Sequence, residues 1–387
     1  MITLFWLSLA IVFYTFLGYG LLLYILIRLK RVFSKPVRHV LNTLPTVTLL
    51  VAAWNEEDMI EQKINNTLAL DYPADRFQII FISDGSTDRT QEYIQPFKQI
   101  VSMHIDERNG KMAAIKRAIP AVTGEIIVFS DANTLLNEQA IKELVKHYQN
   151  KKVGAVAGEK RILVDAQADA SSAGEGFYWK YESKLKTWDY ELYSNVGAAG
   201  ELFSIRTALY QPVETDTIID DHMIAMRIAE QGYIIAYEPN AYASETASAN
   251  TREELKRKIR IAAGGIQSIF RLKKSANPFN HPILTFQYLS HRVLRWTVTP
   301  FLIILAFILN IALVATTNNN VYTVLLIAQI FFYSAAFIGL IFERRNIKIK
   351  SFFVPYYFCV MNYAVIAGIG RYIKKNQSAA WERSLRK

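Results

Sequence analysis

The sequence of 387 residues contains a single cysteine, Cys359, and several long stretches without any charged residue. One thiol excludes both an internal disulfide framework and a metal site built from several cysteines of this chain. We therefore do not expect thiol chemistry. No internal repeat and no low-complexity segment is visible.

Residues 2–27 carry no charge, and this length is sufficient to span the apolar core of a bilayer. A basic run follows directly, consisting of Arg28, Lys30, Arg31, Lys35 and Arg38. A cleaved signal peptide has its basic residues before the apolar core, so the reverse order here predicts a retained transmembrane anchor at residues 1–27. The positive-inside rule places the N-terminus outside and residue 28 onward in the cytoplasm.

Charge is also absent from residues 297–342, where the polar patch 316–320 separates two apolar spans. A third uncharged stretch, 351–370, contains Pro355. We predict C-terminal transmembrane helices over residues 297–373, preceded by an interfacial segment at 276–296 and followed by a basic tail at 374–387. A full third span would place this tail outside. Either 351–370 folds back as a hairpin or re-entrant segment, or the positive-inside rule fails here.

The composition is 51% hydrophobic and 20% charged, which indicates a protein that is part membrane-embedded and part water-exposed. The net charge of +10 is compatible with nucleic acid, anionic lipid or an anionic substrate as partner. Several basic residues cluster beside the apolar spans, and this favours lipid over nucleic acid. We expect a multi-pass protein of the inner or plasma membrane that binds membrane lipids and no nucleic acid, with its large water-exposed domain in the cytoplasm.

Residues 28–275 form the expected cytoplasmic domain, in which short apolar runs alternate with amphipathic stretches. This alternation predicts an α/β fold with a doubly wound, mostly parallel sheet. The predicted strands are 47–54, 77–83, 100–105, 125–130, 153–163 and 233–238. The predicted helices are 56–70, 86–98, 110–122, 137–150, 174–192, 219–231 and 251–271.

Asp131 and Asn133 directly follow the strand predicted at 125–130. Ligands in open α/β sheets bind beyond the carboxyl ends of the strands. Carboxylate and amide oxygens suit Mg²⁺ or Mn²⁺, the metals that accompany a diphosphate. An Asx-type turn after the strand is the alternative for this pair.

Other polar residues follow the neighbouring strands. Glu56, with the backbone near Ala53, can hold a nucleobase or ribose, and Asp84 can accept a hydrogen bond from a uracil ring N–H. Lys111 follows a glycine turn at the start of a helix, where it can pair with a phosphate. Acidic residues near 57 are equally expected at a helix N-terminus, and hydroxyls at 86–87 as helix caps.

Two more stretches complete the candidate site. The small residues of 197–203 allow a backbone to approach a ligand closely. Asp220 and Asp221 are adjacent carboxylates at a predicted helix start, where one can act as a general base. Capping of that helix is the alternative for both residues.

The order and spacing of these stretches, over residues 46–271, resemble the family 2 glycosyltransferases, which are nucleotide-diphosphosugar transferases with the GT-A fold. The resemblance is closer to their membrane-embedded branch, which includes cellulose, hyaluronan and poly-N-acetylglucosamine synthases. It implies that Ala53 and Glu56 bind the nucleoside, that Asp84 contacts uracil and that Lys111 lies near the nucleotide. It also places Asp131 and Asn133 on the metal-binding Asp-x-Asp motif, and Asp221 on the catalytic base.

Two departures from the family pattern affect function. Asn133 replaces the second Asp of the metal motif, which keeps an oxygen ligand but removes a charge. The Gln-x-x-Arg-Trp motif of processive synthases corresponds to residues 257–261, of which only Arg260 is retained. The missing Gln and Trp put processive polymer synthesis in doubt. Basic residues at Arg257 and Arg260 also fit a helix face at the membrane surface.

We therefore predict an inverting transfer of a sugar from a nucleotide-sugar, expected to be a UDP-sugar, to a glycan or polyprenyl-linked acceptor. Asp221, Asp220 and Arg260 are the expected catalytic residues, and Arg257 joins the nucleotide-binding set. Mg²⁺ or Mn²⁺ is the expected cofactor. The alternatives are a processive synthase that also exports its polymer and a catalytically silent membrane scaffold.

Overall fold

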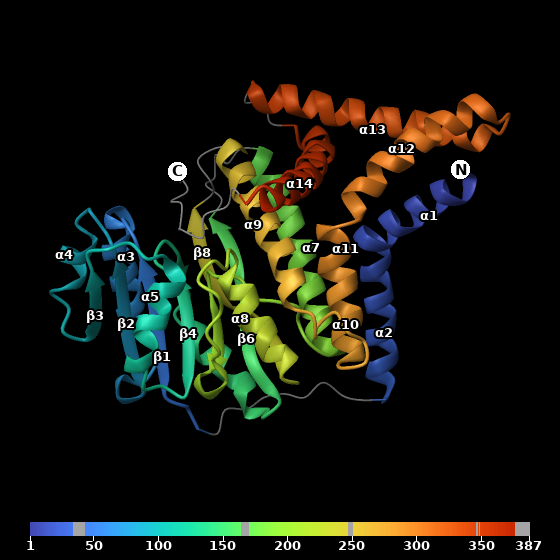
Figure 1. The fold of residues 1–387 in the computed structure, drawn as a ribbon. Coiled ribbons are helices and arrows are strands. Elements are labelled where there is room, and N and C mark those ends of the chain that lie inside the picture. Colours follow the sequence, from blue (N-terminus) through green and yellow to red (C-terminus); the bar gives the residue numbers. More distant parts are fainter. Residues whose placement is uncertain (34–42, 164–169, 247–250, 346, 348, 376–387) are drawn as a thin grey trace.

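The computed structural model describes residues 1–33, 43–163, 170–246, 251–345, 347 and 349–375, without the side chains of 170–178, 251 and 350. Most of the predicted basic tail and part of the basic run after the anchor lie outside the described residues. The elements are arranged as a sheet domain, a group of helices packed beside it and a set of long apolar helices that project away from it (Figure 1).

The domain is built on an eight-stranded mixed sheet with the order β3-β2-β1-β4-β7-β6-β8-β5. The strands are β1 (Val47–Ala53), β2 (Phe77–Asp84), β3 (Ile100–Ile105), β4 (Ile126–Asp131), β5 (Leu135–Leu136), β6 (Val153–Leu163), β7 (Phe203–Arg206) and β8 (Ile234–Thr246). β3, β2, β1 and β4 run parallel, and β7 is antiparallel to both β4 and β6. The six predicted strands are confirmed, while β5 and β7 were not predicted.

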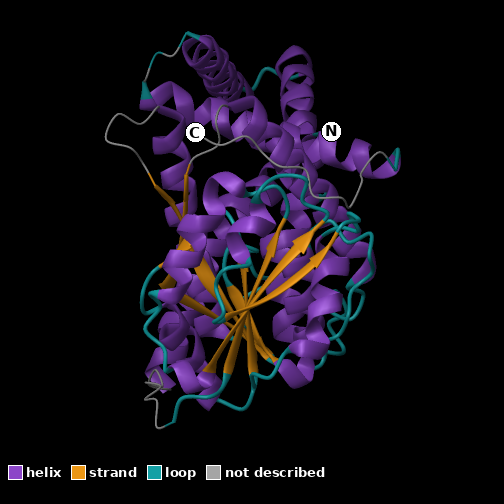
Figure 2. Cartoon of the chain, turned by 90° about the vertical axis from the view of Figure 1, so that its left-hand side faces the viewer, coloured by secondary structure: helices purple, strands orange, loops and turns teal. Residues whose placement is uncertain are grey.

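Helices cover both faces of the sheet, whose strands fan out with its twist (Figure 2). They are α3 (Glu57–Leu68), α4 (Thr90–Ile94), α5 (Lys111–Ala118), α6 (Ala140–Val145) and α8 (Asp220–Glu230). Leu49 and Val51 of β1 pack in one core with Ile60 of α3, whereas Leu50 packs in the opposite core with Ile115 of α5. Burial on both faces explains why the strand sequences are continuously apolar.

Several predicted elements differ in length from the observed ones, and for two of them the local reason is clear. The helix predicted at 86–98 is shorter in the structure, where only α4 is helical, because residues 86 and 87 bind the loop after β1. Asn55 donates its backbone N–H to Ser86 Oγ at 3.1 Å, and Thr87 donates its backbone N–H to Asn55 Oδ1 at 2.8 Å. The strand predicted at 233–238 continues past Pro239 to Thr246, because β8 follows β6 across a register shift beside Glu159.

A second group of helices lies between the sheet and the apolar spans. It comprises α7 (Ala170–Leu192), α9 (Thr251–Arg271), α10 (Pro282–Tyr288) and α11 (Leu294–Trp296). The segment predicted as interfacial buries Leu284, Gln287 and His291, so one of its faces packs inside the protein.

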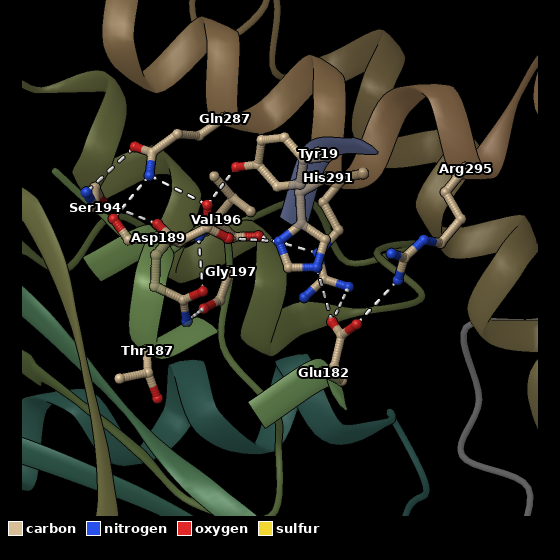
Figure 3. A network of polar contacts seen from close by, with 12 residues as sticks. Tyr19, Glu182, Thr187, Asp189, Ser194, Val196, Gly197, Gln287, His291 and Arg295 are labelled. Carbon is tan, nitrogen blue, oxygen red and sulfur yellow. Dashed lines mark hydrogen bonds and ion pairs between the residues drawn. The ribbon is translucent and has the colours of Figure 1, made fainter. Parts of the chain in front are cut away.

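A buried polar network joins this group to the N-terminal helix (Figure 3). His291 lies 2.5 Å from Asp189 Oδ2 and 3.2 Å from Glu182 Oε1, both carried by α7. Tyr19 donates its hydroxyl to Asp189, and Gln287 donates to the backbone oxygen of the same residue at 2.7 Å. The network therefore holds α7 in a defined position relative to the N-terminal helix.

Four helices in the described part of the chain are long and apolar enough to cross a membrane. They are the continuous helix Ile2–Phe33, which contains α1 (Ile2–Phe13) and α2 (Tyr19–Phe33), then α12 (Thr299–Thr316), α13 (Asn320–Arg344) and α14 (Lys350–Ile373). Large side chains point outward from them, and Phe331 and Phe337 are 76% and 63% exposed. Such surfaces suit contact with lipid tails. Because α14 is one unbroken helix, the hairpin alternative for 351–370 is wrong.

The sidedness of these helices gives the first testable prediction. In a Cys359→Ala background, we expect a membrane-impermeant maleimide added outside intact cells to label Asn318→Cys but not Lys151→Cys, because basic residues flank the domain side of the apolar helices. Both positions are exposed, so access alone does not separate them. Labelling of Lys151→Cys with protection of Asn318→Cys would invert the topology.

Candidate active site

A cavity of about 350 Å³ opens where the sheet domain meets α7, α9 and α14. Its lining brings together residues from strand ends and helix starts that are far apart in the sequence. The predicted site residues in this lining are Lys111, Asp131, Asp220, Asp221, Arg257 and Arg260. Ala53, Glu56, Asp84 and Asn133 were predicted for the same site but lie outside the lining.

Lys111 joins the carboxylates of two different elements. It begins α5 directly after Gly110, whose φ of 90° is accessible mainly to glycine. Its Nζ lies 2.8 Å from Asp131 Oδ1 at the end of β4 and 3.4 Å from Asp220 Oδ2 at the start of α8. Burial lowers the pKa of Lys111, but the two carboxylates outweigh burial and raise it above its usual range. Lys111 is therefore a permanent cation here.

Gly200 marks the point on which three polar groups converge. A Cβ atom added there would lie 3.4 Å from Lys111 Nζ, 3.5 Å from Asp131 Oδ2 and 3.6 Å from Asp221 Oδ2. The absence of a side chain at Gly200 thus leaves room beside a cation, a candidate metal ligand and a candidate base.

Asp221 has the acid–base properties expected of a general base. Burial, together with the adjacent charge of Asp220, raises the pKa of Asp221 to about 7, although Lys111 opposes this shift. A carboxylate whose pKa lies near neutrality accepts a proton more readily than an ordinary aspartate. The shift arises because two carboxylates share one partly enclosed site.

Asp131 and Asn133 fit a divalent cation that is completed by a substrate. In the described ranges, no group of three or more His, Cys, Asp or Glu side chains is arranged to hold a metal. Asn133 Oδ1 is buried and has no hydrogen-bond partner among the described residues. One carboxylate and one available amide oxygen suit Mg²⁺ or Mn²⁺, which commonly take their other ligands from substrate phosphates and water.

Asp84 holds the loop that carries Lys111. Asn109 and Gly110 donate their backbone N–H groups to Asp84 Oδ2 at 3.0 and 2.6 Å, and Arg117 lies 3.4 Å from the other oxygen. The carboxylate is therefore engaged within the protein, and contact with uracil stays a prediction.

The two arginines of α9 differ in their surroundings. Arg257 lies 2.9 Å from Glu201, which also pairs with the buried Lys160 at 2.7 Å. Arg260 makes no hydrogen bond or ion pair with any residue in the described part of the chain. Burial, and then the charge of Arg257, lower the pKa of Arg260. A cavity-facing guanidinium of this kind is better placed than Arg257 to meet an incoming diphosphate.

Several residues that line the cavity were given no role in the site from the sequence, although some lie within its candidate stretches: Arg108, Trp179, Glu182, Lys186, Glu201, His222, Lys258, Arg292 and Trp296. A partial signal exists in β6, whose apolar first half is followed by the charged residues Glu159, Lys160 and Arg161. Charged residues within a buried strand usually serve a buried ion pair or a site. Lys160 does pair with Glu201 and Glu245, and so fixes the loop that begins at Gly200.

The sheet topology and the polar cluster at its strand ends define a nucleotide-diphosphosugar transferase fold. Residues 48–209 match the family model described as glycosyl transferase family 2. Residues 48–209 are therefore similar to a family 2 glycosyltransferase domain, and the chain has the GT-A-like fold that the sequence pattern predicted.

Relatives and a solved structure agree with this assignment. A poly-β-1,6-N-acetyl-D-glucosamine synthase of Staphylococcus aureus is 27% identical over 258 residues, which cover 62% of this chain and 61% of that protein. A probable glycosyltransferase of Bacillus subtilis, YdaM, is 24% identical over 74% of this chain and 73% of its own length. The mannosyltransferase PcManGT of Pyrobaculum calidifontis, solved with GDP-Man and Mn²⁺, has a TM-score of 0.71 and 24% identity, and the match covers 97% of this chain and 100% of that one.

Proposed function

We propose that this chain is a membrane-bound inverting glycosyltransferase that moves a sugar from a nucleoside-diphosphate sugar, which we expect to be a UDP-sugar, to a glycan or lipid-linked acceptor. The observation that carries the proposal is the convergence of Lys111, Asp131 and Asp221 around Gly200. These three residues supply a cation, a metal-ligand oxygen and a base within one cavity. The reaction needs these three functions, and a direct displacement needs no covalent intermediate.

Each residue has a defined part in the displacement. Asp221 takes the proton of the acceptor hydroxyl as that oxygen attacks the anomeric carbon. Lys111 and Arg260 face the negative charge that develops on the departing diphosphate. Asp131 and Asn133 would hold Mg²⁺ or Mn²⁺, which would add positive charge at the same diphosphate. The cavity holds donor and acceptor in line, and this lowers the entropic cost of the reaction.

Membrane attachment and the side on which the domain works belong to the same proposal. The apolar helices, including the residues of α14 in the cavity wall, support an acceptor that reaches the site from the membrane. Basic residues beside these helices support a cytoplasmic domain next to an anionic leaflet.

The expected product is one or a few added sugars. The Gln and Trp that the family resemblance links to a growing chain are replaced by Arg257 and Ile261. The similarity to a poly-N-acetylglucosamine synthase supports the processive alternative. Chain length measured by mass spectrometry on product from the purified protein separates the two, and long polymer would exclude the single-addition proposal.

The metal motif gives a prediction of its own. Asn133→Asp restores a second carboxylate, so we expect the apparent Mn²⁺ affinity for turnover to stay equal or to increase. The Mn²⁺ concentration giving half-maximal activity is the measurement. Asn137→Asp, a change of the same kind in the loop after β5, is the control. A folded but inactive Asn133→Asp enzyme would contradict the assigned role.

A further inference from the structure

Lys186 of α7 is a buried cation in the wall of the cavity. Its side chain lines the cavity and the residue is only 7% exposed. Among the described residues it makes no hydrogen bond or ion pair; its ammonium lies 5.7 Å from the ring centroid of Trp179 and 5.4 Å from that of Tyr237. Aromatic rings attract a cation but do not neutralise its charge. An unpaired charge in such a position is costly unless a ligand completes it.

Glu182 and Glu201, which also line the cavity, are engaged with other cations. Glu182, one turn earlier on α7, lies 2.9 Å from both Arg292 and Arg295 and 3.2 Å from His291, as part of the network in Figure 3. Glu201 pairs with Lys160 and Arg257. Burial raises the pKa of Glu159 against the opposing charge of Lys186, and no ion pair joins the two.

A second lysine lies beside the same indole. Lys258 of α9 is 8% exposed, lies 5.2 Å from the ring centroid of Trp179 and pairs with Glu254 at 3.2 Å. Trp179, Lys186 and Lys258 all line the cavity. Lys186 of α7 and Lys258 of α9 therefore bring two positive charges to one cavity.

The adjoining cavity wall is apolar. Met361, Ala364 and Val365 of α14 line it, together with Ile261 and Ala262 of α9. α14 packs against both α9 and α7, the two helices that carry the lysines. A cationic position beside an apolar helix suits a molecule with an anionic head and an apolar chain.

We propose that Lys186 and Lys258 bind the phosphate of an acceptor whose apolar chain lies along α14. This inference rests on the proposed glycosyl transfer and names the acceptor class for the same cavity. It differs from the donor site, because the donor diphosphate is assigned to Lys111, Arg260 and the metal ligands. A neutral glycan acceptor would leave Lys186 uncompensated.

Binding to the full-length protein in neutral phosphatidylcholine nanodiscs tests the proposal. Calorimetry would compare the affinities of the protein for farnesyl phosphate, farnesol and inorganic phosphate. Titration with UDP plus Mn²⁺ would measure binding at the donor site. We expect Lys186→Gln to weaken farnesyl phosphate binding by about 10-fold or more, the scale of losing a hydrogen bond to a charged group. Lys186→Arg should retain binding, and Lys184→Gln, two residues away at an exposed position of α7, should match the wild type.

Each other outcome has a definite meaning. The proposal would be overturned if Lys186→Gln bound farnesyl phosphate with unchanged affinity. It would also be overturned if this variant lost affinity for farnesol to the same extent as for farnesyl phosphate, or if it lost affinity for UDP. Inorganic phosphate binding as tightly as farnesyl phosphate would overturn the role of α14. If Lys186→Gln does not fold, Lys258→Gln tests the same position. The wild type failing to bind any nucleoside diphosphate would instead refute the proposed function, whatever the farnesyl phosphate result.

Discussion

Turnover should fall by at least about 100-fold in Asp221→Asn, the usual scale for losing a general base. Asparagine keeps the shape of the side chain but cannot accept the proton from the acceptor hydroxyl. The base acts in the transition state, so kcat should fall while the affinity for UDP changes little. Donor turnover and calorimetric UDP binding are the two measurements.

Asp220→Asn is the matched control because it removes a carboxylate one residue away. The two side chains point about 100° apart on α8, so only one can face the reacting carbon well. Asp220 pairs with Lys111, and its loss should be milder. If Asp220→Asn is the more damaging change, or if Asp221→Asn keeps near-normal turnover, Asp221 is not the base.

The pH profile provides a second readout of the same residue. Asp221 must be deprotonated to act, and its pKa is raised to about 7. Activity should therefore decline as the pH falls through about 7, instead of through the range of an ordinary aspartate. This acidic limb should shift downward in Asp220→Asn, because removing the neighbouring charge lowers the pKa of Asp221. An acidic limb that is unchanged in Asp220→Asn would contradict the coupling.

Asp131→Asn should lower turnover by about 1,000-fold, because it weakens the metal site and removes one of the carboxylates that pair with Lys111. The loss corresponds to roughly 4 kcal/mol of transition-state stabilisation, within the several kcal/mol that a bound cation supplies. Excess chelator should abolish wild-type activity, and Mn²⁺ or Mg²⁺ should restore it.

Asp106→Asn is a suitable control for this change, because Asp106 is a fully exposed aspartate whose carboxylate lies 3.1 Å from His104 Nε2. It should retain normal turnover and Mn²⁺ dependence. Full wild-type turnover in excess chelator would refute the metal assignment, and normal Mn²⁺ dependence in Asp131→Asn would remove Asp131 from the metal site.

The sequence predicted the parallel half of the sheet because those strands are buried on both faces and read as unbroken apolar runs. Leu49, Leu50 and Val51 show this, because these consecutive residues alternate between the two cores on opposite faces of the sheet. The sequence also predicted that Lys111, Asp131 and Asp221 lie in one site, because each was expected just beyond a strand end or at a helix start.

Other features depend on contacts between distant segments and leave little local signal. β7 has only four residues and is ordered by pairing with β4 and β6 on either side. β8 continues beyond Pro239 because β6 supplies its partner. The roles of Glu201 and Lys186 depend on which charges surround them in space, and sequence spacing does not reveal this.

The central claim is that this cavity transfers sugar from a nucleoside-diphosphate donor. Its most direct test is to incubate the purified protein in lipid with Mn²⁺, a panel of UDP- and GDP-sugars and a polyprenyl-linked acceptor, and to identify the products by mass spectrometry. We predict release of nucleoside diphosphate from one donor, together with acceptor extended by one or a few sugars, and loss of both in Asp221→Asn. Wild-type protein that binds lipid normally but neither releases nucleoside diphosphate nor extends the acceptor with any donor would contradict the claim and favour a catalytically silent scaffold.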